Sequence, residues 1–335
     1  MGGKISKKIG KIILWVLLGF IILDLTLVGL LFIPAVQTFA VNKVTEKVSK
    51  SWGSELSIHD VHLTPTLKLL AHGVRIHDNH HQDMIYVGTV KARIRYISLT
   101  PFQLKFGEVR LDKANVVIRK YKGDDGVNIA IWAKKFQTGD TTKSQFLLTS
   151  SHLFLKNSRF AYINDNDRVV FNTDNHPDID YSYFELKDIN WETYKFSIVG
   201  SSISAKFKHL AFNQYGGFSL KDASGDFNIC GTGLTFNKLK LYTKNSKLDL
   251  DFKFRYKSWD SYGDFLNKIR FIVKIRPSTL DMHDVAGFAP QIKGMREIVF
   301  LTASRFDGPV NDFKIIDVHA GWGMRNFVHG DIGIK

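Results

Sequence analysis

The chain has 335 residues, with 46 Lys and Arg, 32 Asp and Glu, a single cysteine and a net charge of +14. Its 26 Phe against 7 Pro exclude a disordered or collagen-like chain. One cysteine excludes a disulfide scaffold and a cysteine-based zinc site. The length allows one elongated domain or two compact ones.

The N-terminal segment predicts a membrane anchor. Residues 1–11 carry four lysines and no acidic residue, and residues 12–33 are apolar apart from Asp24 and Thr26. A helix over residues 12–33 would be about 33 Å long, enough to cross a hydrocarbon core of about 30 Å. The positive-inside rule then makes residues 1–11 a cytoplasmic basic tail and places the rest across the membrane. A cleaved signal peptide, cut at residues 38–40, is the alternative, but the length of the apolar run favours a retained anchor.

Residues 34–53 predict a short amphipathic helix beside the membrane. Apolar residues recur at helical spacing from Val36 to Val48 with charged residues between them, and Gly53 marks the end. Such a helix could rest on lipid headgroups, plug the end of the next domain or cap the edge of a sheet.

Residues 54–335 predict an all-β domain, because the hydrophobic period changes from 3.6 to 2. At roughly a dozen residues per strand and turn this domain holds on the order of twenty strands, too many for one flat sheet, so the sheet must curl, fold over or close. Weak helical periodicity remains at 140–148 and 281–288. The clearest alternating runs are 90–96, 203–208, 247–256 and 268–276.

The apolar face of these strands needs a cover, which is either a second sheet or a ligand. Alternation by itself cannot distinguish the two. A long apolar trough suits acyl chains, and a basic polar face on a membrane tether favours lipid, since anionic headgroups attract Lys and Arg. The residues that we expect to line a lipid-binding trough are Leu248, Leu250, Phe252, Phe254, Tyr256, Ile269, Phe271, Val273 and Ile275.

Catalytic and metal-binding motifs are missing from the sequence. The polar segment 77–83 contains three histidines but is typical of a hairpin tip, and the acidic stretch from Asp165 lacks the Gly and Glu of a calcium loop. We therefore expect a protein that is not an enzyme and has no catalytic residue, metal or cofactor. Lysines alternate with acids along single strands, which argues against nucleic acid as a partner.

Several short motifs, taken in order, carry a resemblance to a known family. They are Pro34-Ala-Val-Gln-Thr38, Gly53-Ser-Glu-Leu-Ser-Ile58, Met84-Ile-Tyr-Val-Gly88, Gly216-Gly-Phe-Ser-Leu220 and Val285-Ala-Gly-Phe-Ala-Pro290. In this order the chain resembles the N-terminal part of the AsmA-like translocation and assembly module family, the TamB type in its Bacteroidota form. Each motif is loose, and the resemblance rests on their order along nearly the whole chain.

The resemblance implies a single-pass protein of the bacterial inner membrane with an elongated, taco-like periplasmic β-groove. It implies phospholipid transport between the inner and outer membranes and a part in outer-membrane biogenesis, with phospholipid and the inner membrane as partners. The alternative is a scaffold or chaperone for outer-membrane protein assembly or secretion with a β-barrel partner. The resemblance brings no catalytic residues. Members of the family are several times longer, so we expect residues 54–335 to be incomplete at the C-terminus.

Overall fold

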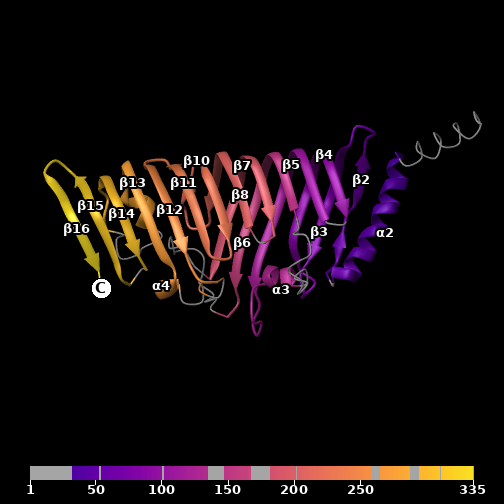
Figure 1. The fold of residues 1–335 in the computed structure, drawn as a ribbon, viewed down its shortest axis with the longest axis horizontal. Coiled ribbons are helices and arrows are strands. Elements are labelled where there is room, and N and C mark those ends of the chain that lie inside the picture. Colours follow the sequence, from indigo (N-terminus) through magenta and orange to yellow (C-terminus); the bar gives the residue numbers. More distant parts are fainter. Residues whose placement is uncertain are drawn as a thin grey trace, which may run out of the picture.

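Most of the chain folds into one open β-sheet. The structure is a computed structural model that describes residues 32–52, 54–99, 102–134, 147–166, 182–200, 202–258, 261, 265–286, 294–309 and 311–334. Sixteen strands in these residues form the sheet, which is not closed into a barrel. They lie side by side along the long axis of the molecule, from α2 (Pro34–Trp52) at one end to β16 (Asn326–Ile334) at the other (Figure 1).

The strands follow one another in the sheet almost in chain order. The described strands are β1 (Leu56–Ser57), β2 (Asp60–Leu63), β3 (Lys68–His77), β4 (Asp83–Leu99), β5 (Phe102–Lys120), β6 (Leu147–Asn164), β7 (Tyr183–Val199), β8 (Ser202–Gln214), β9 (Ser219–Leu220), β10 (Asp222–Cys230), β11 (Gly233–Tyr242), β12 (Lys247–Arg255), β13 (Arg270–Asp281), β14 (Ile298–Gly308), β15 (Phe313–Trp322) and β16. The short helices are α3 (Asn128–Lys134), α4 (Phe265–Lys268) and α5 (Met282–Ala286).

The predicted β-rich domain is confirmed as a single open sheet. Its described strands number sixteen instead of about twenty because β4 to β7 are 17 to 19 residues long, more than the estimate allowed for. Of the two predicted helical stretches, the second contains α5. The first lies largely outside the described residues, and its last two residues, Leu147 and Leu148, belong to β6.

One pair of strands is parallel in an otherwise antiparallel sheet. β5 and β6 pair in parallel from Gln103 with Leu147 to Lys120 with Asn164. A parallel pair needs a long crossover connection, and α3 lies in it. Arg119 and Asp165 join the ends of the two strands, with Nε to Oδ2 at 2.6 Å and Nη2 to Oδ1 at 3.1 Å.

Bulges in the middle of the strands bend the sheet. Lys238 has φ +51° and lies where the β11–β12 register shifts by one residue. Its N–H donates to Asp251 Oδ1 at 2.6 Å, and the N–H of Asp317, another bulge residue with φ +53°, donates to Asp331 Oδ1 at 2.9 Å. An extra residue on one strand adds twist and a local bend. Repeated along the sheet, these bulges curl it instead of leaving it flat.

Helix α2 covers the β2 end of the sheet. Gln37 behaves like one more residue of a strand, because its Nε2 donates to the Leu63 carbonyl at 2.7 Å and its Oε1 accepts the Leu63 N–H at 2.6 Å. Thr38 Oγ1 accepts the Val61 N–H at 3.2 Å, and Ser49 Oγ accepts the Leu56 N–H at 2.8 Å. The helix therefore satisfies backbone groups that a sheet edge would otherwise leave open.

The predicted membrane-spanning segment, residues 12–33, lies outside the described residues except for its last two. Residues 1–11 lie outside them entirely. Among the helices that the structure describes, none has the length and apolar character needed to cross a membrane.

Candidate functional site: an open apolar face

Seven of the nine predicted trough residues lie on strands β12 and β13. Their cross-strand partners are Phe254 with Phe271, Phe252 with Val273, and Leu250 with Ile275. Directly opposed residues of neighbouring strands share a face of the sheet. The structure therefore brings these side chains together on one face, and Leu248 joins them through its pairing with Leu241 on β11.

The other two predicted residues, Tyr256 and Ile269, lie just outside the strands and are buried. Ile269 is 0% exposed and Tyr256 is 6% exposed. The Tyr256 hydroxyl donates to the Cys230 carbonyl at 2.7 Å, which ties the end of β12 to the end of β10. The accessible part of the predicted set is thus the seven residues on β12 and β13.

Aromatic side chains continue this face far beyond the two strands. Neighbouring ring centroids lie 4.5 to 6.4 Å apart along a row contributed by seven strands, β7 and β10 to β15. We call this set the aromatic row: Trp191, Phe227, Phe236, Phe252, Phe271, Phe306 and Phe313. The sequence predicted two of its members as site residues. The other five members lie on β7, β10, β11, β14 and β15. The alternation within one strand does not show which strands are its neighbours, so the sequence could not add these residues to the site.

The aromatic row is half-buried throughout, because the residues that the structure describes form a single sheet with no second layer over it. Small clusters of buried residues flank it. One is centred on Phe207 and Leu239, and another, nearer α2, on Ala92, Val109 and Leu153. The apolar face therefore runs along the sheet from β3 to β15 and keeps part of its surface accessible. A binding site for apolar chains requires this accessibility.

The opposite face of the sheet is polar, and several of its charges are paired across strands. Arg276 Nε lies 2.5 Å from Asp249 and its Nη1 2.8 Å from Asp251. The hydrogen bond from Arg276 is the main reason why the pKa of Asp251 lies below its ordinary value. Arg159 and Glu185 form a similar pair at 2.5 Å. One face of the sheet is thus suited to water and the other to apolar groups.

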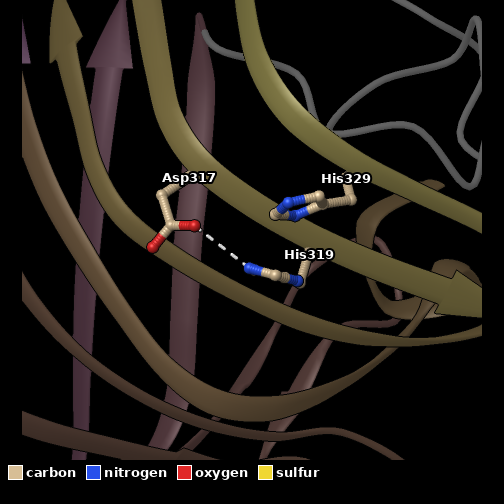
Figure 2. A group of neighbouring side chains, drawn as sticks. All are labelled: Asp317, His319 and His329. Atoms are coloured by element: carbon tan, nitrogen blue, oxygen red, sulfur yellow. Dashed lines mark hydrogen bonds and ion pairs between the residues drawn. The ribbon is translucent and has the colours of Figure 1, made fainter.

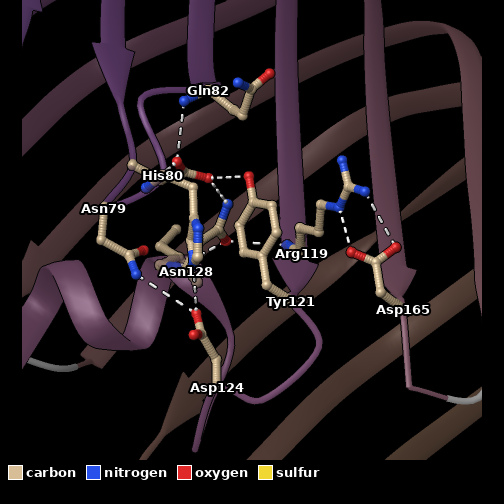
Figure 3. A network of polar contacts seen from close by, with 10 residues as sticks. Asn79, His80, Gln82, Arg119, Tyr121, Asp124, Asn128 and Asp165 are labelled. Carbon is tan, nitrogen blue, oxygen red and sulfur yellow. Dashed lines mark hydrogen bonds and ion pairs between the residues drawn. The ribbon is translucent and has the colours of Figure 1, made fainter.

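The predicted hairpin tip at residues 77–83 is held by a buried carboxylate. Asp78 is 4% exposed and accepts hydrogen bonds from the Tyr121 hydroxyl at 2.7 Å, from Asn128 Nδ2 at 3.0 Å and from the N–H groups of His80 and Gln82 (Figure 3). Burial by itself would raise the pKa of Asp78, but these hydrogen bonds outweigh it and hold that pKa below its ordinary value.

The Asp78 network fixes the crossover between the two parallel strands. Asn128 Oδ1 accepts the N–H of Arg119 at 3.0 Å and that of Ile129 at 2.8 Å. The Asn128 side chain therefore joins the first turn of α3 to β5. Burial, followed by the hydrogen bond to Asp78, raises the pKa of Tyr121. The bonds centred on Asp78 and Asn128 connect the hairpin tip, β5 and α3, which is the arrangement of a structural joint.

A second polar group lies on β15 and β16. Asp317, His319 and His329 are exposed, and the atoms that they could offer to a metal lie within 4.8 Å of one another, the one such group in the described ranges (Figure 2). His319 Nε2 lies 3.0 Å from Asp317 Oδ1, and the two imidazole rings lie 4.0 Å apart. Sequence reasoning missed this group because His319 and His329 meet only through strand pairing.

Comparison with known proteins identifies a family. A model of the AsmA family matches residues 6–228, about two thirds of the chain. The matched region ends in β10, so it includes the Asp78 network and the first two members of the aromatic row. The AsmA family is associated with outer-membrane assembly and lipid transport. No curated protein matches the chain.

Proposed function

The chain belongs to the AsmA family, and from this premise we propose that it is a translocation and assembly module protein of the TamB type. In this proposal residues 12–33 anchor it in the inner membrane, the sheet lies in the periplasm, and its apolar face holds phospholipid acyl chains in transit to the outer membrane. Its partners are phospholipid and the inner membrane, and it acts without catalysing a reaction or binding nucleic acid.

The observation that supports this proposal best is the aromatic row. From β7 to β15 the sheet has eight strands, so at about 4.8 Å per strand the row extends over about 34 Å. One leaflet of a bilayer is about 15 Å deep in hydrocarbon, half of a core of about 30 Å. The row is therefore longer than the depth of a leaflet, so a chain can shift along it and remain in apolar contact.

A passive mechanism follows from the chemistry of the two faces. Apolar burial is non-directional and stabilises by about 0.8 kcal/mol per methylene, so a chain displaced along the row exchanges one set of contacts for an equivalent set. The charged headgroup would stay in water at the border of the sheet, because the apolar face offers it no compensating partner. The direction of net movement would then come from the membranes at the two ends.

Site-specific photo-crosslinking tests the proposal. A photoreactive amino acid replaces Phe252 on the apolar face or Lys253 on the polar face of the same strand, in the full chain within native membranes. We expect phospholipid adducts at position 252 and background levels at position 253, measured by mass spectrometry. The absence of lipid adducts at 252, or equal yields at 252 and 253, would contradict the proposal.

The same experiment separates the alternative function. Polypeptide adducts at position 252, without lipid, would favour a scaffold or chaperone for outer-membrane protein assembly with a β-barrel partner. Strand addition to an exposed sheet edge is the mode by which such a scaffold would receive its clients.

A further inference from the structure

A cluster of cations without acidic partners lies at the α2 end of the sheet. It consists of Lys68 on β3, Lys91, Arg93 and Arg95 on β4, and Lys105 on β5, and we call it the basic rim. All five side chains are exposed, and among the described residues none of them forms an ion pair. Elsewhere on the polar face, Arg276, Arg159 and Lys206 each have a carboxylate within 4 Å. The exposed Lys240 and Lys274 form no ion pair among the described residues, but their cross-strand partners are acidic, Asp249 and Asp251.

The basic rim places like charges directly opposite each other. Lys68 and Arg93 are cross-strand partners, a pairing that destabilises a sheet unless an anion lies nearby. They line a shallow cavity of about 470 Å³ together with His62, Thr64 and Lys91. Glu108, the acidic residue in the lining, already accepts a hydrogen bond from Arg110 at 2.5 Å. The cavity therefore offers donors and positive charge to an oxygen-rich anion such as a phosphate group.

Exposed apolar side chains accompany these cations. Leu67, Tyr96 and Ile97 are 46%, 48% and 50% exposed. A bulge at Arg95 sets Tyr96 opposite Lys105, and Lys105 Nζ lies 5.2 Å from the centre of the tyrosine ring. Aromatic and aliphatic residues mixed with unpaired Lys and Arg are the composition of surfaces that enter the headgroup region of a membrane.

The basic rim lies where the predicted membrane segment joins the sheet. Gln37 in the first turn of α2 is bonded to Leu63, and Thr64 is bonded in turn to Lys68, with Lys68 N–H to Thr64 Oγ1 at 3.1 Å. Ile33, which directly precedes α2, and Phe39 in α2 are 43% and 66% exposed. Cations, apolar side chains and the end of residues 12–33 are therefore neighbours.

We propose that the basic rim docks onto anionic phospholipid headgroups of the bilayer that holds the anchor. This contact would hold the α2 end of the sheet against the membrane surface. The apolar face would then begin next to the lipids of the bilayer. The inference deepens the proposed function by assigning its membrane contact. It commits to a bilayer surface, because the exposed apolar side chains would gain nothing from a phosphate ion in solution.

The test uses the full chain in nanodiscs of phosphatidylcholine with or without about one fifth phosphatidylglycerol. A fluorophore is attached at Tyr96→Cys in a Cys230→Ser background, and quenching by a spin-labelled headgroup reports the distance of the rim from the bilayer. We expect strong quenching with the anionic lipid, weak quenching without it, and loss of the difference in about 1 M salt, where the Debye length is about 3 Å. Ile97→Cys provides a second labelling site should Tyr96→Cys disturb the fold.

Charge-removal variants decide between docking and mere tethering. Arg93→Gln with Arg95→Gln should lower the docked-to-undocked ratio about tenfold or more, given the attraction of each cation to an anionic surface. The matched control, Lys240→Gln with Lys274→Gln, removes two exposed cations of the polar face far from the rim and should leave quenching unchanged. Equal quenching in both lipid mixtures, or an equal effect of both variant pairs, would overturn the inference.

The two proposals fail separately. Lipid adducts at position 252, together with equal quenching at position 96 in both lipid mixtures, would support the lipid-binding trough and reject the docking surface. Quenching at position 96 that depends on the anionic lipid, without phospholipid adducts at position 252, would support the docking surface and reject the trough.

Discussion

The two ends of the sheet share one architecture but carry different side chains. Near α2 the buried residues of the apolar face include small ones such as Ala71, Ala92 and Val109, while the five exposed cations of the basic rim form no ion pair among the described residues. From β7 to β15 the apolar face carries large aromatic rings, and cations such as Arg276 are paired with carboxylates across strands. The adjacent cations of the basic rim thus lie at one end and the open aromatic surface at the other.

This comparison teaches that a repeated strand pattern does not imply a repeated role. Strand alternation sets which face is apolar, but the size of the apolar side chains and the pairing of the charges vary along the sheet. The joint between the two regions is the parallel β5–β6 pair, which Asp78, Asn128 and Arg119 hold in place. Each region can therefore be perturbed on its own.

The largest expected effect comes from charging the aromatic row. Phe252→Asp with Phe271→Asp places two carboxylates on the apolar face, where they have no partner, so we expect lipid recovered with the full chain to fall to background. Lys253→Asp on the polar face of the same strand is the control and should retain lipid. Circular dichroism checks that both variants keep their β-structure. A folded double variant that still carries lipid would show that the row is not the trough.

Breaking the joint should reduce stability strongly. Asp78→Ala removes the acceptor of the Tyr121 hydroxyl and of two backbone N–H groups, and one of the two acceptors of the buried Asn128 amide. At about 1–3 kcal/mol for an unsatisfied buried donor, we expect a loss of about 3 kcal/mol in the free energy of unfolding. Urea unfolding measures it. Asp125→Ala, which changes an exposed carboxylate in the same segment, should change the free energy by less than about 0.5 kcal/mol. Similar losses for both variants would contradict the role of the network.

A pH dependence is expected from Glu185 at the start of β7. Burial raises its pKa, but the hydrogen bond from Arg159 and further partners lower it overall, below the ordinary value of 4.5. A carboxyl whose folded pKa is depressed stabilises the fold above its unfolded pKa and loses that contribution as pH falls through the folded value. Wild type should therefore be more stable than Glu185→Gln at pH 7, by about 1–2 kcal/mol, and the difference should shrink below pH 4. A difference that is constant with pH would contradict this assignment.

The smallest expected effect concerns a bulge. Lys238 adopts φ +51°, a conformation that costs a non-glycine residue about 1 kcal/mol, so Lys238→Gly should be neutral or stabilise by about 0.5 kcal/mol. At Lys240, two residues on and with ordinary strand geometry, the same substitution should destabilise by about 0.5–1 kcal/mol. Thermal unfolding compares the two. Equal destabilisation would mean that the bulge is not a position of backbone strain.

Part of the candidate site could be read from the sequence because it depends on local alternation. Phe252 and Phe254 repeat every second residue, as do Phe271 and Val273, so each pair must share a face of its own strand. The same logic fails at a bulge. Strict alternation over the run 90–96 would place Tyr96 on the face of Val90 and Ile94, but the irregularity at Arg95 turns it to the face of Lys105. A one-residue insertion reverses every side chain beyond it.

The sequence by itself determined that most of the chain beyond the first helix forms amphipathic strands with one apolar face, because a period of two needs only local geometry. Tertiary structure decided the rest. The parallel β5–β6 pair, the alignment of Trp191 with Phe227 and the opposition of Lys68 to Arg93 all depend on the register between strands. Register is set by turns, bulges and buried contacts between residues distant in the chain, so a single strand carries no record of which side chains its neighbours will place beside it.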